Sequence, residues 1–318
     1  MYIGIDIGGS HISAGLIDQE GKIIRKSSCS NNLENKYEQF IKNIADLCQE
    51  ILKEEGMSIR QIDSLGIGIP GSVDNEKGTV TSISNIKMKD APIRQEIKKY
   101  FDIPVYIEND ANCAAFGEFL CGAAKGTRVS VTITIGTGIG VGIIINDKIF
   151  GGFNSAASEQ GHNVIVVGGE RCTCGRKGCW EAYSSANALI RETKKLLDME
   201  GEFINSKIHE VIKGDYSKIN GKIIFDAAKE GDVLANEVVH QYVWYLSEGL
   251  ANVVNAIMPE VLVIAGGISQ QGDYLLNMLI NRVNNYIYTK QSPKTELRIA
   301  KLGVDAGLIG AGMLKMNY

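Results

Sequence analysis

Three cysteines within eight residues constrain this chain more than any other feature of its sequence. They are Cys172, Cys174 and Cys179, and His162 lies ten residues before the first of them. Three thiolates and one imidazole complete a tetrahedral shell for zinc and leave no position open for water. A metal bound by these four residues would therefore be structural.

The glycines of this segment support the metal-site interpretation. Gly175 and Gly178 can take the positive backbone φ that a tight knuckle around a metal often needs. The alternative is three buried free thiols, which is a common state for a single cysteine. That alternative explains poorly why three cysteines gather around glycines in so short a run. We therefore expect a zinc site formed by His162 and the three cysteines.

Two acidic residues bracket the cysteine run. Glu159 lies three residues before His162, and Glu181 lies two residues after Cys179. Carboxylates accept hydrogen bonds, and the hydroxyls of a sugar can supply them. Either glutamate alone is typical of a solvated surface charge. Because a closed metal site would hold both glutamates and His162 close together, we interpret the set as a sugar-binding cluster.

Composition excludes several classes of protein. The 318 residues are 44% hydrophobic and 22% charged, which is ordinary for a globular protein and predicts about two domains. The net charge is −4 and no basic block occurs, so nucleic acid is not an expected partner. No apolar run approaches the roughly 20 residues of a membrane span, and the first residues form a strand pattern without a leader. Seven cysteines, four of them scattered, favour reduced thiols and the cytoplasm.

Apolar patterns and glycine turns divide the chain into alternating strands and helices. Residues 2–7, 12–17 and 22–27 predict an antiparallel meander, and residues 129–150 repeat that order. Further strands are expected at 65–69, 104–107, 261–264 and 297–302, and helices near 35–55, 181–197, 224–230, 232–257, 275–287 and 306–315. The polar segment 198–222 is interpreted as a surface excursion. The alternation favours α/β with mixed sheets, and the repeated order indicates duplicated domains with a cleft between them.

Three glycine turns follow apolar strands, at residues 8–10, 136–140 and 266–267. Glycine lets backbone N–H groups approach phosphate oxygens without interference from a Cβ atom. Each turn alone is weak evidence, and none has P-loop or dinucleotide-fold spacing. Together with Asp6 they indicate a split nucleotide-binding cleft. Asp6 itself fits two roles equally, a magnesium ligand acting through water and a carboxylate that stabilises the turn.

Asn109 and Asp110 lie where an expected strand meets an alanine-rich helix. Both residue types are favoured as helix N-caps. Capping requires only one of them. The other could point into the cleft, where a carboxylate could accept a hydroxyl proton during phosphoryl transfer.

Taken in order, these features resemble the sugar kinases of the ROK family (repressor, open reading frame, kinase) over nearly the whole chain. The most specific parts of the resemblance are residues 159–162 and 172–181, joined by residues 6–10, 68–71, 108–112 and 136–140. Residues 172–183 are most similar to bacterial glucokinases. The resemblance implies two actin-like ATPase (ribonuclease H-like) domains around a central cleft. We expect a smaller domain of residues 1–117 plus 303–318 and a larger domain of residues 118–302.

The resemblance also implies a reaction and its site residues. The reaction would be ATP-dependent phosphorylation of D-glucose at the 6-hydroxyl, with Asp110 as general base, and the protein would be a homodimer. The other sugar-binding residues would be Asn109, Glu159, His162 and Glu181, with Gly71 and Asn85 lining the pocket. ATP would be contacted by Gly8, Gly9, Ser10, Thr137, Gly138, Gly266 and Gly267, with Asp6 organising Mg²⁺. Structural Zn²⁺ would be held by His162, Cys172, Cys174 and Cys179, leaving the second ring nitrogen of His162 for the sugar.

The sequence departs from the family pattern at three places. Ser10 replaces the usual threonine but keeps its hydroxyl, His11 stands where many members have lysine or asparagine, and residues 154–158 hold fewer glycines than usual. The last departure leaves a kinase for N-acetylmannosamine, fructose or allose as the alternative. A sugar-sensing repressor is less favoured because the chain begins at its first strand without a helix-turn-helix. Retention of Asp110 argues against a catalytically inactive sensor.

Overall fold

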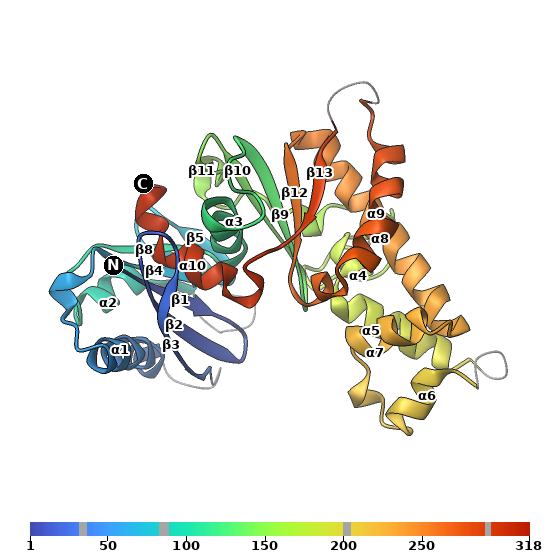
Figure 1. The fold of residues 1–318 in the computed structure, drawn as a ribbon, viewed down its shortest axis with the longest axis horizontal. Helices are drawn as coiled ribbons and strands as arrows, with labels where there is room; N and C mark the ends of the chain where they lie inside the picture. The colour runs from blue at the N-terminus through green and yellow to red at the C-terminus, as the bar shows by residue number, and fades with distance from the viewer. Residues whose placement is uncertain (32–36, 83–88, 200–204, 290–293) are drawn as a thin grey trace. The chain divides into compact units, whose positions relative to one another are not determined.

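The structure, a computed structural model, describes residues 1–31, 37–82, 89–199, 205–289 and 294–318 (Figure 1). Its internal contacts divide the chain into two compact units. Unit 1 comprises residues 1–132, 141–158 and 300–318, and unit 2 comprises residues 133–140 and 159–299. The expected domain division at residues 118 and 302 stays a prediction, and Asn85 lies outside the described residues.

The strands and helices follow the alternation expected from the sequence. The strands are β1 Tyr2–Ile7, β2 His11–Ile17, β3 Ile23–Ser30, β4 Ser64–Ile69, β5 Ser72–Asp74, β6 Thr79–Ser82, β7 Lys89–Ala91, β8 Val105–Asn109, β9 Val129–Ile135, β10 Ile139–Ile145, β11 Lys148–Ile149, β12 Val261–Ala265 and β13 Glu296–Ile299. The α-helices are α1 Tyr37–Glu54, α2 Ile93–Lys98, α3 Asp110–Cys121, α4 Glu181–Ser184, α5 Ala186–Leu197, α6 Lys207–Ile212, α7 Gly221–Lys229, α8 Val233–Ile257, α9 Asp273–Tyr286 and α10 Ala306–Gly312.

The sheets combine parallel and antiparallel pairing. The first has the order β3-β2-β1-β4-β8, with an antiparallel meander from β1 to β3 and parallel pairing of β1, β4 and β8. The second has the order β11-β10-β9-β12-β13, where β10 and β11 are antiparallel and β12 and β13 are parallel. A third, small antiparallel sheet contains β5, β6 and β7. The expectation of an α/β fold with mixed sheets is confirmed.

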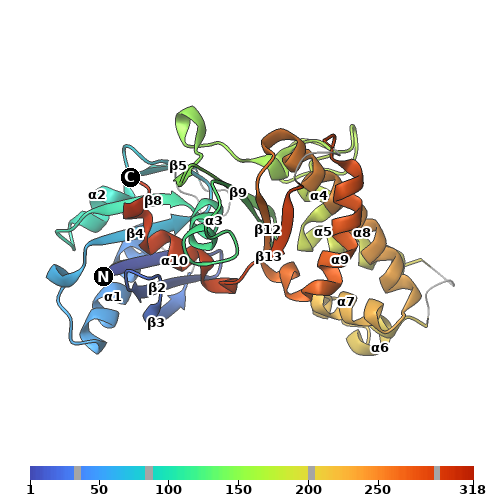
Figure 2. The ribbon, with the colours of Figure 1, turned by 45° about the horizontal axis from the view of Figure 1, so that its top comes forward.

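Helices α1 and α10 cover opposite faces of the first sheet (Figures 1 and 2). On one face, the isoleucines of β1 share a buried apolar core with α1. On the other face, glycines let α10 approach closely. A Cβ atom on Gly4 would lie 2.2 Å from the carbonyl oxygen of Leu308, and one on Gly66 would lie 1.7 Å from that of Ala311. Any side chain at either glycine would force α10 away from the sheet.

The same close packing fixes helix α3 of unit 1. A Cβ atom on Gly117 would lie 2.3 Å from the carbonyl oxygen of Ala306, and one on Gly310 would lie 1.8 Å from that of Cys113. Helix α3 begins at Asp110, directly after β8. The packing of α3 on α10 therefore sets where Asp110 lies in this unit.

Unit 2 is built around the 25-residue helix α8, which packs against α4, α5, α7 and α9 (Figure 2). Trp180, only 1% exposed, lies against this helix. A Cβ atom on Gly249 of α8 would be 2.0 Å from the Trp180 ring, so glycine makes room for the indole. Trp180 directly follows Cys179, and its burial anchors the cysteine run to the helical core.

Two expectations about local structure were wrong, and one small sheet was not anticipated. The helix near 181–197 is two helices, because Ser185 accepts a hydrogen bond from the Ala188 N–H at 3.2 Å and caps α5. The segment 198–222 includes helix α6, whose Ile208 and Ile212 are fully buried. The small sheet of β5, β6 and β7 was not expected at all. Within the described ranges, no helix has the length and apolar character that crossing a membrane requires.

Candidate active site

The three cysteines and His162 gather as the sequence predicts. Their ligand atoms all lie within 4.8 Å of one another. Cys172 Sγ is 3.6 Å from His162 Nδ1, and Cys174 Sγ is 3.6 Å from Cys179 Sγ. Zinc bonds of about 2.0–2.3 Å put tetrahedral ligand atoms about 3.3–3.8 Å apart. Both the spacing and the chemistry of this donor set fit zinc.

Two glycines shape the backbone of this metal knuckle, which we define as residues 172–179. Gly175 and Gly178 have φ of 91° and 86°, a region that favours glycine. A Cβ atom on Gly178 would also meet the carbonyl oxygen of Val166 at 1.7 Å. The knuckle closes through hydrogen bonds from the Cys172 N–H to the Arg176 carbonyl at 2.9 Å and from the Gly175 N–H back to the Cys172 carbonyl at 3.0 Å.

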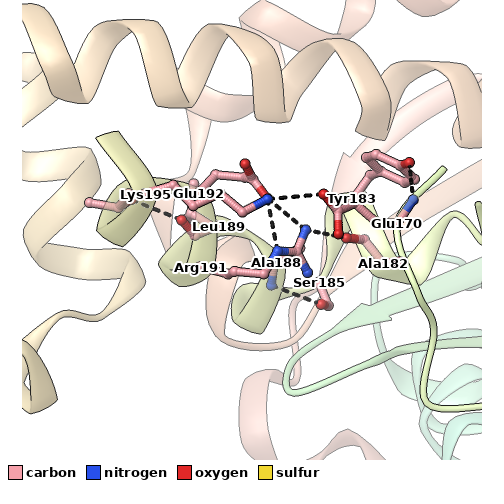
Figure 3. Close-up of polar contacts among 10 residues, drawn as sticks. Glu170, Ala182, Tyr183, Ser185, Ala188, Leu189, Arg191, Glu192 and Lys195 are labelled. Atoms are coloured by element: carbon pink, nitrogen blue, oxygen red, sulfur yellow. Dashed lines mark hydrogen bonds and ion pairs between the residues drawn. The ribbon is translucent and has the colours of Figure 1, made fainter. Parts of the chain in front are cut away.

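The segment that leads into the knuckle is tied to helices α4 and α5 (Figure 3). The Glu170 N–H donates to the Tyr183 hydroxyl at 2.6 Å, and Lys195 Nζ lies 2.9 Å from Glu170 Oε1. Arg191 Nη2 donates to the Ala182 carbonyl at 2.7 Å. These contacts join both sides of the knuckle to one rigid helical pair.

The two ring nitrogens of His162 face different groups. Nδ1 faces Cys172, whereas Nε2 lies 4.0 Å from Glu159 Oε2. His162 ends the short 3₁₀ helix Gln160–His162, so it and Glu159 lie one turn apart. Glu159 is 60% exposed, so its carboxylate is open to solvent in unit 2. One side of the imidazole is therefore placed for a metal and the other for an accessible polar ligand.

Glu181 lies between the knuckle and a glycine turn of the same unit. Its Oε2 accepts a hydrogen bond from the Ile139 N–H at 3.0 Å. Its Oε1 accepts one from Thr173 Oγ1 at 3.2 Å. Residues 136–138, which include Thr137 and Gly138, form the turn between β9 and β10. We call this turn, together with the first two residues of β10, the glycine turn (residues 136–140).

The remaining glycines of the expected nucleotide set divide between the two units. Gly8, Gly9 and Ser10 join β1 to β2 in unit 1, where the Gly8 N–H donates to the His11 carbonyl at 2.9 Å. Gly266 and Gly267 follow β12 in unit 2. Gly266 has a φ of 83° and its Cβ atom would lie 2.4 Å from the Ile135 carbonyl oxygen, so a side chain is excluded there.

In unit 1, Asn109 takes the cap role at the start of α3. Its Oδ1 accepts hydrogen bonds from the N–H groups of Ala111 and Asn112 at 2.9 and 3.1 Å. Its Nδ2 donates to the Gly71 carbonyl at 3.2 Å, which leaves one amide hydrogen for a ligand. The partly exposed Asp110 also accepts from the Ala111 N–H, at 2.9 Å. Both side chains therefore accept from the Ala111 N–H, and Asn109 also accepts from that of Asn112.

Asp6 shares an acidic region with Asp110. Burial and, less strongly, the charge of Asp110 raise the pKa of the Asp6 carboxyl, while Lys26 lowers it, and the net result is a pKa of about 6. Gly307 leaves room at this point, since a Cβ atom there would lie 3.1 Å from Asp6 Oδ1. Neighbouring carboxylates of this kind fit a divalent cation, which prefers oxygen ligands.

Sequence reasoning missed Glu108, the residue before Asn109. Its side chain is only 1% exposed. It accepts hydrogen bonds from the Asn109 N–H at 2.8 Å, from Asn112 Nδ2 at 3.0 Å and from Asn75 Nδ2 at 2.5 Å. Burial raises the pKa of Glu108, and these hydrogen bonds oppose the rise. Its position beside Asn109 at the end of a strand was the one sequence signal for a role at the site. The sequence gives no sign that the Glu108 side chain is buried.

A protein-family comparison matches residues 2–317 to the ROK family. The chain belongs to the ROK family. It therefore has the actin-like ATPase fold that was expected, with mixed sheets. The glucokinase of Halalkalibacterium halodurans is 35% identical over 317 residues, which are 98% of this chain and 94% of that protein.

Two further relatives differ from each other in function. A ROK family glucokinase from Streptomyces griseus, solved in complex with glucose and AMPPNP, is 33% identical with a TM-score of 0.85, and the match covers 98% of each chain. The xylose repressor of Bacillus spizizenii is 30% identical over 99% of this chain and 77% of its own length. The family thus includes enzymes and regulators of similar fold.

Proposed function

We propose that this protein is an ATP-dependent hexose kinase that phosphorylates D-glucose on its 6-hydroxyl. The observation that carries the proposal is the likeness to glucokinases along almost the full length of both chains. The grouping of His162 with Glu159 and Glu181, and the acidic group at Asp110, supply the chemistry that such a reaction needs.

Asp110 acts as general base in this proposal. As the 6-hydroxyl oxygen bonds to the γ-phosphorus of ATP, its proton passes to the Asp110 carboxylate and the bond from phosphorus to the ADP oxygen breaks. Asn109 holds the start of α3 and offers its remaining amide hydrogen to the sugar. Glu108 holds the Asn109 N–H and the Asn112 side chain, so it positions this turn.

The sugar hydroxyls are bound by Asn109, Glu159, His162 and Glu181, with Gly71 and Asn85 as further lining residues. Carboxylates and an amide suit a ring with several hydroxyls, because each can form a hydrogen bond with one of them. His162, Cys172, Cys174 and Cys179 would hold zinc, which would fix the tautomer and orientation of His162. The zinc takes no part in the transfer itself.

The nucleotide is bound by Gly8, Gly9, Ser10, Thr137, Gly138, Gly266 and Gly267. Backbone N–H groups of such turns donate to phosphate oxygens. Magnesium organised by Asp6, through water, would neutralise charge on the phosphates. Magnesium, ATP and reduced cysteines together favour the cytoplasm as the site of action.

A panel of hexoses tests the substrate. Release of ADP is measured with D-glucose, N-acetylmannosamine, fructose and allose, and kcat/KM is expected to be highest for glucose. A higher value for any of the other three would replace glucose as the substrate and leave the hexose kinase standing. Turnover of 6-deoxyglucose would show that the reacting oxygen is wrong.

Assembly as a homodimer is proposed by analogy with family kinases. Light scattering at micromolar protein is expected to give twice the 34.5 kDa chain mass. A monomer mass would refute the dimer without affecting the proposed reaction.

A further inference from the structure

The carboxylate of Glu181 joins two segments of unit 2 that are far apart in the sequence. Oε2 accepts a hydrogen bond from the Ile139 N–H in the glycine turn at 3.0 Å. Oε1 accepts one from Thr173 Oγ1 in the knuckle at 3.2 Å, and Cys172 Sγ lies 3.7 Å from the same oxygen. Each oxygen therefore serves one segment, so a shift of the knuckle would be transmitted to the turn.

The carboxylate of Glu181 lies close to the backbone of Gly138 in the glycine turn. A Cβ atom on Gly138 would lie 2.4 Å from Glu181 Oε2 and 3.2 Å from its Cδ. The φ of Gly138 is not in the left-handed region, so the backbone conformation alone does not demand glycine. A side chain at 138 would therefore push the Glu181 carboxylate away from its hydrogen bond with the Ile139 N–H.

The turn is also held from the helical side. The Gly136 N–H donates to the Gly138 carbonyl at 3.0 Å, which closes the turn. The Ala186 N–H, in the first turn of α5, donates to the Gly136 carbonyl at 2.9 Å. Glu181 begins the preceding helix α4. The glycine turn thus rests on the helical segment that directly follows the knuckle.

We propose that Glu181 is a positioning residue that couples the metal knuckle to the glycine turn, so that metal bound by the knuckle strengthens nucleotide binding. The proposal rests on the proposed function, in which the glycine turn contacts ATP. A turn must keep its N–H groups aimed at the phosphates to bind them well, and Glu181 orients this turn. Loss of the metal frees the knuckle and, through Thr173 and Glu181, loosens the turn.

Calorimetry with AMPPNP and magnesium, in the absence of sugar, tests this coupling. Zinc-loaded wild-type protein, chelator-treated protein and zinc-reloaded protein are compared, with circular dichroism to monitor the fold. We expect removal of zinc to weaken AMPPNP binding about fivefold or more, a typical coupling between sites, and reloading to restore it. In Glu181→Ala the affinity is expected to be lower and to change by less than about twofold when zinc is removed.

The results separate this inference from the proposed function. Unchanged AMPPNP affinity in zinc-free wild-type protein overturns the coupling but leaves a nucleotide-binding enzyme. An equal loss in wild type and in Glu181→Ala overturns the role of Glu181. Absence of AMPPNP binding by zinc-loaded wild-type protein, with the fold intact, defeats both the proposed function and the inference.

A second set of variants tests the coupling in zinc-loaded protein, in case the zinc-free chain unfolds. Gly138→Ala is expected to weaken AMPPNP binding about fivefold or more in the wild-type background. In Glu181→Ala it should weaken binding by a smaller factor, because the clash with the carboxylate is gone and only the direct effect of the added methyl group on the phosphate contact remains. Thr173→Val, which removes the donor to Oε1, should weaken binding, whereas Thr173→Ser should not. The inference would be contradicted if Gly138→Ala weakened AMPPNP binding equally in both backgrounds. It would also be contradicted if Thr173→Val and Thr173→Ser changed AMPPNP affinity equally.

Discussion

At the scale of single residues, Asp6 carries an unfavourable charge at neutral pH. Burial and the charge of Asp110 raise its pKa from 3.8 to about 6. Between about pH 4 and pH 6, the folded protein therefore holds a proton on Asp6 that the unfolded chain has already released. The contribution of Asp6 to the free energy of unfolding is greatest below about pH 4 and falls as pH rises through 6. A magnesium ion nearby would stabilise the ionised carboxylate and reverse this loss of stability, which is the behaviour expected of a cation site.

Asp6→Asn is predicted to stabilise the magnesium-free protein. The shift of about two pKa units corresponds to at most about 3 kcal/mol, and we expect about 1–2 kcal/mol at pH 7.5 because part of the side chain remains open to water. The gain should fall by about half at pH 5. Urea unfolding at both pH values measures it, and a gain that does not change with pH would contradict the account.

Asp110→Asn is predicted to lower kcat by roughly 10²–10⁴, the usual worth of a general base, while glucose affinity changes little. The carboxylate is replaced by an isosteric group that cannot take the proton. Asp102→Asn, at an exposed position of the same unit, is the matched control and should leave kcat unchanged. Near-normal turnover with an intact circular dichroism spectrum would refute the assignment.

At the scale of elements, the knuckle is proposed to link metal to substrate. Cys179 is fully buried, directly precedes Trp180 and lies two residues before Glu181. Its Sγ lies 3.6 Å from that of Cys174, and it belongs to the cluster with His162, so it is one of the four proposed zinc ligands.

Cys179→Ser is predicted to reduce bound zinc from about one per chain to well below half, because a three-ligand site is incomplete. Glucose affinity should fall with it, since His162 and Glu181 lose their positions. Elemental analysis and glucose titration measure the two effects. Cys29→Ser, outside the cluster, is the control, and zinc loss with unchanged glucose affinity would refute the coupling.

The loop before Glu159 contains serines in conformations that favour glycine. Ser155 has a φ of 59° and Ser158 a φ of 74°. The sequence showed that this loop has few glycines, and the structure shows that the backbone nonetheless adopts the left-handed region. Such a conformation costs about 1–2 kcal/mol for a residue with a side chain.

Ser155→Gly is predicted to stabilise the protein by up to about 1 kcal/mol, because relief of the backbone strain is partly offset by the greater freedom of glycine in the unfolded chain. Ala156→Gly, in the same loop but without positive φ, should destabilise it. Thermal or urea unfolding distinguishes the two. Destabilisation by both substitutions would show that Ser155 is not strained.

Residue chemistry determined which elements were predictable. The knuckle followed from the spacing of the cysteines. The order of strands along the chain followed from apolar runs such as residues 2–7. Helix α6 was missed because its two buried isoleucines stand in a polar segment. Glu108 was missed because a carboxylate gives no sign in the sequence of being buried. The hydrogen bond from Ile139 to Glu181 joins segments 42 residues apart, which no local pattern can indicate.

At the scale of the whole molecule, the proposed reaction draws on both compact units. Asp6, Asn109 and Asp110 belong to unit 1, whereas His162 and Glu181 belong to unit 2. The residues proposed for ATP divide in the same way. The proposed transfer of phosphate from ATP to glucose therefore requires residues of both units.

Identification of the product tests this claim most directly. Zinc-loaded protein is incubated with magnesium, ATP and D-glucose, and the sugar product is analysed by phosphorus and proton nuclear magnetic resonance. We expect glucose 6-phosphate, with phosphorus coupled to the protons on C6 and one ADP formed per sugar phosphate. ADP formed without a sugar phosphate, or phosphate on any other oxygen of glucose, would contradict it.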